Sequence, residues 1–163
     1  LFPYTTLFRS VSRITHPSDR FNPGMDILGV VSSLEDGRVC LSQRELLGTW
    51  EENAALFSQG ETVAGIIRSV EDYGVFVELT PNLAGLAEPR AGVAPGQNAG
   101  VYIKSILPSK MKLKLVIIDT SPPTNERNPP NYFITGGHID HWVYSPPGCP
   151  KMIETMFNRD VQP

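Results

Sequence analysis

Between Gly60 and Asp119 the sequence repeatedly sets a short apolar run between turn-forming residues. Short runs with alternating or β-branched apolar residues predict strands rather than helices. Five strands are expected, at Val63–Val70, Tyr73–Leu79, Leu83–Ala87, Ala99–Leu107 and Lys112–Ile118. Five short strands within about 60 residues are enough for one small closed barrel. The sequence therefore predicts a mainly β fold organised around such a barrel.

The second of these strands places an aromatic ring in an unusual position. Val75, Val77 and Leu79 alternate with Phe76 and Glu78, which is the pattern of a half-buried strand. If the valines face the core, Phe76 and Glu78 share the face that points to water. An aromatic ring left in water is a candidate binding surface, unless another part of the chain covers it. The linker helix and the C-terminal hairpin described below are the candidates for such a cover.

The residues before the barrel predict a hairpin and a short helix. Asp36-Gly37 separates MDILGVVSSL from RVCLS, and this dipeptide is a strong hairpin signal. Thr49 followed by Glu52 is a capping-box signature, so we expect a helix at Trp50–Ser58. A Pro-Gly pair precedes both this hairpin and the last two barrel strands. The hairpin is therefore interpreted as the end of an earlier, partial repeat.

The composition changes after Asp119. The segment SPPTNERNPPN predicts an extended, exposed connector. The runs YFIT and HIDHWVY flank Gly136-Gly137 and predict a C-terminal hairpin. The run KMIETMF, which follows, predicts one or two helical turns.

The first ten residues, LFPYTTLFRS, need a separate explanation. They resemble the translation of a common sequencing-library adapter oligonucleotide. We interpret residues 1–10 as an adapter artefact fused to a partial gene and exclude them from fold reasoning. The alternative is a genuine, loosely ordered N-terminus. On the first interpretation the natural start of the protein is missing.

Charge and cysteine content narrow the class of protein. The net charge is −3, yet Pro89–Ile118 holds five basic residues and no acidic one. Such a local basic strip fits a polyanion, or simply a solvated strand face. Cys40 and Cys149 have no paired spacing, so a disulfide framework is not expected and a reducing cytoplasm fits. No apolar run is long enough to cross a bilayer.

The segment GETVAGIIRSVEDYGVFVELTPNLAGLAE resembles the first half of the S1 RNA-binding domain, an OB-fold repeat. The matching residues are Gly60, Val63 and Gly65, then Asp72–Val77, then Gly85-Leu86. PGQNAGVYIKSI and KLKLVIID resemble its closing strands, and VCLSQRELLGTWEEN resembles a junction between tandem repeats. The resemblance implies a partial repeat at 11–45, a linker helix at 46–59, an S1-like OB-fold barrel at 60–120 and a connector with a C-terminal hairpin at 121–163.

The resemblance also implies a site for single-stranded RNA on one face of the barrel. The residues carried over, or expected beside them, are Tyr73, Phe76, Arg68, Lys104, Lys112 and Lys114. Bases stack on exposed aromatic rings, and each stacked base contributes about 1–3 kcal/mol. Glu88 stands where the family usually has a histidine, and Leu107 and Lys112 replace an aspartate and an arginine. These departures imply an interface weaker than, or tuned differently from, the usual one.

Other classes of function are less well supported by the residues. His138, Asp140, His141 and Cys149 are metal-ligand types, but in a strand His141 points away from the first two, so a polar hairpin face is expected. No nucleophile elbow, Walker loop or dinucleotide fingerprint is present, so neither an enzyme nor a cofactor is expected. The expected partners are single-stranded mRNA and the small ribosomal subunit. The alternative is a degenerate repeat that docks on the ribosome or a protein without touching RNA.

Overall fold

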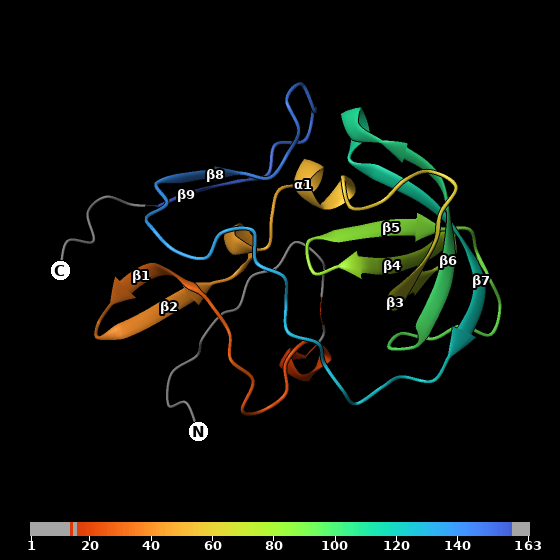
Figure 1. The fold of residues 1–163 in the computed structure, drawn as a ribbon, viewed down its shortest axis with the longest axis horizontal. Coiled ribbons are helices and arrows are strands. Elements are labelled where there is room, and N and C mark those ends of the chain that lie inside the picture. The colour runs from red at the N-terminus through yellow and green to blue at the C-terminus, as the bar shows by residue number, and fades with distance from the viewer. Residues whose placement is uncertain (1–13, 15, 158–163) are drawn as a thin grey trace.

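The computed structural model describes residue 14 and residues 16–157, so the segment interpreted as adapter-derived lies outside the described residues. Five strands form a closed barrel in the order β3-β4-β5-β7-β6 (Figure 1). They are β3 (Thr62–Glu71), β4 (Gly74–Thr80), β5 (Leu83–Ala87), β6 (Asn98–Leu107) and β7 (Lys112–Ser121). Neighbours pair antiparallel except β5 and β7, which are parallel, and β3 pairs with β6 to close the barrel. The five predicted strands and the mainly β class are confirmed.

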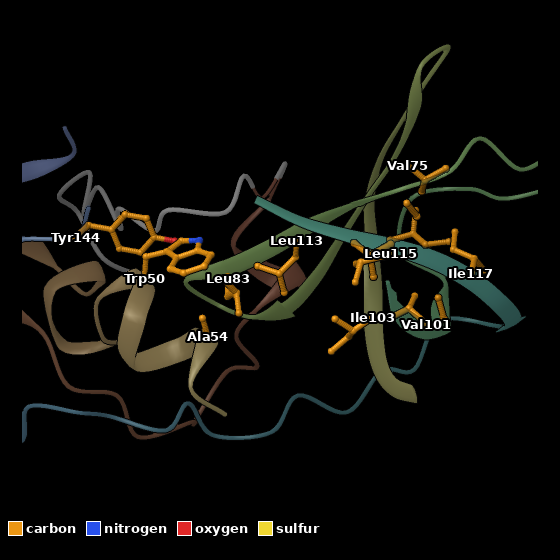
Figure 2. Close-up of a cluster of buried hydrophobic side chains, with 14 of the residues drawn as sticks. Trp50, Ala54, Val75, Leu83, Val101, Ile103, Leu113, Leu115, Ile117 and Tyr144 are labelled. Carbon is orange, nitrogen blue, oxygen red and sulfur yellow. The ribbon is translucent and has the colours of Figure 1, made fainter. Parts of the chain in front are cut away.

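The interior of the barrel is filled by the alternate residues of each strand. Val75 and Val77 of β4 are fully buried, as the alternation predicts. They belong to one cluster with aliphatic side chains from the other strands, namely Ile67, Val101, Ile103, Leu113 and Leu115, of which Figure 2 labels the last four. Each such burial stabilises the fold by about 1.5–3 kcal/mol. This apolar interior fixes which residues of each strand must face outward.

The hairpin before the barrel is confirmed. β1 (Val30–Glu35) pairs antiparallel with β2 (Arg38–Ser42). Asp36 and Gly37 form the turn with φ of 50° and 73°, as a two-residue turn between twisted strands requires. A short 3-10 turn, η1 (Pro17–Asp19), precedes the hairpin, and a second, η2 (Arg44–Leu46), follows it.

The linker helix begins where the sequence predicts and ends earlier. In α1 (Trp50–Ala54) the Thr49 hydroxyl accepts a hydrogen bond from the Glu52 N–H at 3.1 Å, and the Glu52 carboxylate accepts one from the Thr49 N–H at 3.0 Å. The predicted end at Ser58 is wrong. The chain turns after Ala54 so that the Gly60 N–H reaches the Ile103 carbonyl at 2.8 Å, which aligns it for entry into β3.

The C-terminal strand pair is confirmed, but its partners differ from the prediction. β8 (His141–Val143) pairs with β9 (Glu154–Met156), so the predicted helical turns at 151–157 are wrong. The run at 132–135 is not a strand. Its groups bond elsewhere: the Leu28 N–H donates to the Tyr132 hydroxyl, and the Phe133 N–H donates to the Leu46 carbonyl.

The C-terminal segment packs onto the barrel through the linker. Trp142 and Tyr144 belong to the same buried cluster as Trp50 and the barrel interior (Figure 2). The Trp50 N–H donates to the Tyr144 carbonyl at 3.0 Å, and the Tyr144 hydroxyl donates to the carbonyl of Asn82 in the β4–β5 turn. Burial raises the pKa of the Tyr144 phenol. None of the described helices has the length and apolar character of a membrane span.

Candidate nucleic-acid interface

A shallow groove of about 500 Å³ lies on the outer face of the barrel, across β4, β5 and β7. Its walls carry aromatic, aliphatic and charged side chains: Tyr73, Phe76, Ala84, Leu86, Glu88, Lys104, Met111, Lys112 and Lys114. Every described residue that lines it falls between Tyr73 and Leu115, in the barrel strands and their turns. Within residues 16–157, neither the linker helix nor the C-terminal segment covers it.

Strand register sets the positions of the groove residues. Phe76 of β4 pairs with Leu86 of β5, and Leu86 pairs with Lys114 of β7. These three side chains therefore form one row across the outer face. Ala84 and Lys112 lie two residues away along β5 and β7, on the same side of the sheet. The alternation that fills the barrel interior also assembles this outer row.

Two aromatic rings stand at one end of the groove. Tyr73 lies in the two-residue turn between β3 and β4, with 64% of its surface exposed. Phe76 is half-buried, and the two rings meet edge to face with centroids 6.1 Å apart and planes at 83°. At Gly74, between them, a Cβ would lie 2.5 Å from the Ala87 carbonyl oxygen. Glycine there lets β4 approach β5 closely at the aromatic end of the groove.

The charged side chains of the groove are three lysines and one glutamate, which gives a net charge of +2. Lys112 and Lys114 are exposed on β7. Lys104 lies in the irregular step of the β6–β7 ladder, and its ammonium donates to the Glu88 carboxylate at 3.0 Å, with both side chains 58% exposed. The carboxylate that departs from the family pattern thus partly neutralises one lysine.

Arg68 does not reach this groove. It is 11% exposed, and its guanidinium donates to Glu78 at 2.7 Å in a separate cavity that also contains Arg20. The expectation that Glu78 faces water beside Phe76 is wrong, because Glu78 is only 6% exposed and binds both arginines. Burial lowers the pKa of Arg20 despite this partner. Arg20 precedes the hairpin, and no local sequence pattern connects it with β4.

The groove also contains residues that the sequence interpretation did not assign to a site. Leu86 and Ala84 lie between the aromatic and basic ends, and Met111 closes the β6–β7 turn in a left-handed conformation with φ of 49°. Counting alternate residues along β5 from Leu86 would have placed Ala84 and Glu88 on the same face. Met111 gave no such signal, since it lies outside the strands.

The histidines of the C-terminal segment pair with single carboxylates. His138 bonds to Asp140 at 2.9 Å, and His141 bonds across the strand pair to Glu154 at 2.8 Å. Within the described residues, no three histidine, cysteine, aspartate or glutamate side chains gather into a metal-binding group. Cys40 and Cys149 are both free thiols.

Comparison with known proteins identifies several relatives that have the same name. No family model matches the chain. Proteins named small ribosomal subunit protein bS1 are similar to it: that of Leuconostoc lactis is 29% identical over 117 residues, 69% of this chain and 26% of the relative. That of Rhizobium meliloti is 27% identical over 123 residues, 66% of this chain and 22% of the relative. That of Chlamydia muridarum is 30% identical over 79 residues, 47% of this chain and 14% of the relative.

The chain thus spans about a quarter or less of the length of these relatives. Two of the matches extend over more residues than the barrel of 62–121 contains, so they include flanking segments as well. The barrel is closed and has the five strands expected from the sequence, and several proteins of one name are 27–30% identical to parts of this chain. The closed five-stranded barrel and these similarities together support an S1-type OB-fold domain in this chain.

Proposed function

We propose that this chain binds single-stranded RNA in the groove between Tyr73 and Lys114. The observation that supports this most is the juxtaposition of an aromatic pair and three lysines in one groove that no other described segment of the chain lines. Aromatic rings accept the flat face of any base, and lysines neutralise the phosphates between successive bases. The groove needs no chemical step to do this. It holds the strand by stacking and by charge.

The wider role that we propose is binding of mRNA in the cytoplasm, near the small ribosomal subunit, during translation. The relatives with this domain are proteins of the small ribosomal subunit by name, which supports this setting. The hairpin β1–β2 is proposed to be the end of a preceding repeat. Neighbouring repeats that bind one strand raise its affinity without any new contact in either repeat.

Binding of a labelled RNA oligomer measures the contribution of the aromatic pair. Phe76→Ala should weaken binding of a pyrimidine octamer by about 1–3 kcal/mol, because one stacked base loses its platform. Fluorescence anisotropy at low salt gives the dissociation constant for each variant. Tyr102→Ala is the matched control, since Tyr102 is a 40% exposed aromatic of β6 that does not line the groove.

The salt dependence of the same titration tests the lysines. Three phosphate contacts on a single strand should give a slope of about −2 in log K against log salt. Lys114→Met should reduce the magnitude of that slope by roughly 0.7. Equal affinities for the Phe76 and Tyr102 variants, with no salt slope, would contradict the proposed function.

Such a result would favour the second candidate, a module that docks on the ribosome or a protein without RNA contact. The observation in its favour is the apolar surface of the first hairpin, where Val31, Leu34 and Val39 are each about half exposed. The acidic Glu88 in the groove also favours it, because a carboxylate repels phosphate. In that case the hairpin, rather than the barrel groove, would carry the interaction.

A further inference from the structure

We infer that Glu88 selects bases that carry an exocyclic amino group, so that the groove prefers cytosine to uracil. This inference rests on the proposed function, because it concerns the base that lies beside the aromatic pair. It assigns a positive role to the residue that departs most from the family pattern. The alternative role of Glu88 is simple repulsion of phosphate.

Glu88 lies close to the aromatic end of the groove. Val75 of β4 pairs with Ala87 of β5, so the next step of this antiparallel ladder sets Gly74 opposite Glu88. Gly74 directly follows Tyr73 and lies two residues before Phe76. Phe76 pairs with Leu86, two residues from Glu88, and such diagonal neighbours on one face lie about 7–8 Å apart, within reach of aromatic and long side chains. A base stacked on Phe76 therefore has an edge within reach of the Glu88 carboxylate.

The carboxylate is held in place and still has capacity to accept hydrogen bonds. Lys104 donates to Oε1 at 3.0 Å, and among the described residues this is the one polar partner of the side chain. The Glu88 N–H donates to the Leu115 carbonyl at 3.2 Å, which fixes the backbone beside β7. A carboxylate offers about four lone-pair positions, so one lysine leaves Oε2 open to a ligand.

The chemistry of the two pyrimidines differs at the atom that would meet this carboxylate. Cytosine has an N4 amino donor where uracil has an O4 acceptor, and glutamate is a suitable acceptor for cytosine N4. Single-stranded RNA exposes these edges to side chains. A uracil would bring its carbonyl oxygen against a carboxylate and leave both unpaired. Lys112 and Lys114, on the neighbouring strand, remain available for the phosphates.

The test compares two octamers, one of cytidine and one of uridine, against the full chain by fluorescence anisotropy. The wild-type protein should bind the cytidine octamer roughly tenfold more tightly. Glu88→Gln should bring the ratio close to one, because the amide can donate to uracil O4 and is a weaker acceptor for cytosine N4. The matched control is Glu61→Gln, which removes one exposed carboxylate outside the groove and should keep the wild-type ratio.

A second variant separates base selection from charge. Lys112→Met removes one positive charge from the groove and leaves the pair of Glu88 and Lys104 intact, so the salt slope should fall by about 0.7 while the preference for cytidine persists. If Glu88→Gln tightens both octamers by the same factor, or leaves their ratio unchanged, the carboxylate does not select bases and the inference is overturned. In those cases RNA still binds, so the proposed function stands. Absence of binding to both octamers would overturn the two together.

Discussion

At the scale of single residues, two glutamates of the barrel region, Glu78 on β4 and Glu88 after β5, have opposite roles. Glu78 is buried and held by Arg20 and Arg68, whereas Glu88 is exposed and shares its charge with one surface lysine. A buried carboxylate needs its partners, because an unpaired charge in the interior is strongly unfavourable. An exposed one is hydrated and remains free to meet a ligand. Burial therefore separates the structural glutamate from the candidate binding one.

Removal of Arg20 tests the structural role of this cluster. Arg20→Met should lower the free energy of unfolding by about 1–3 kcal/mol, because Glu78 loses its ion pair with Arg20 while the one with Arg68 remains. Urea unfolding followed by tryptophan fluorescence gives this value. Arg38→Met, on the exposed face of the first hairpin, is the control and should be nearly neutral. Identical midpoints for the two variants would show that the Arg20 pair contributes no net stability.

At the scale of secondary structure, short local signals account for most of the elements. The capping box of Thr49 and Glu52 starts α1, and Asp36-Gly37 turns the first hairpin. Such signals act over a few residues, so they are legible in the sequence. They do not determine how far an element continues. The end of α1 depends on the bond from Gly60 to Ile103, which connects residues far apart in the chain.

The contribution of the cap is measurable. Thr49→Ala should destabilise the protein by about 1 kcal/mol, because the Glu52 N–H loses its acceptor at the start of the helix. Thr49→Asp keeps an acceptor at the same position and should restore most of the stability. Thermal unfolding by circular dichroism compares the three proteins. If the alanine and aspartate variants melt together, the cap is not the source of the effect.

The sequence predicts the features that depend on local signals, and it does not predict those that depend on contacts between residues far apart in the chain. The barrel strands and the row from Phe76 to Lys114 depend on alternation and on nearest-neighbour pairing. The secondary structure of YFIT and KMIETMF depends on partners that are distant in the sequence. Tyr132 bonds to Leu28, and β9 pairs with β8 across a proline-containing loop. Arg68 has outward parity yet turns to Glu78, since Arg20 completes that cluster from the other end of the chain.

At the scale of the whole molecule, the tail and the barrel share one buried cluster. Tyr144 packs beside Trp50 (Figure 2), and its hydroxyl donates a hydrogen bond to the Asn82 carbonyl. Asn82 in turn donates to the carbonyls of Arg44 and Gly48 in the linker, at 2.7 and 2.8 Å. The turn between β4 and β5 therefore connects the barrel, the linker and the C-terminal segment. Loss of one of these hydrogen bonds should lower the stability of all three parts.

The ionisation of Tyr144 should make the stability of the folded protein depend on pH. Its pKa is raised above the ordinary value of 10.0 by burial, so above pH 10 the unfolded chain loses a proton that the folded chain keeps. Stability should be unaffected by this group below pH 10 and should fall as the pH rises beyond it. Tyr144→Phe should cost about 0.5–1.5 kcal/mol at neutral pH and remove this alkaline decline.

Urea unfolding between pH 7 and pH 11 measures both effects. Tyr73→Phe is the control, because Tyr73 is 64% exposed and should leave the pH profile of the wild type unchanged. If the Tyr144 variant loses stability at alkaline pH as steeply as the wild type does, another group is responsible for the decline.

The connection between the hairpin and the barrel has a mechanical consequence. Tandem repeats joined by a flexible linker adopt many relative orientations, and a long ligand binds only some of them. Here the residues between β2 and α1 accept hydrogen bonds from the Asn82 side chain in the barrel. They also accept hydrogen bonds from the Phe133 N–H and from the Thr155 hydroxyl, which donates to Glu45. The hairpin and the barrel should therefore tumble as one rigid body. An RNA strand that leaves the groove toward the hairpin would meet a surface of fixed orientation.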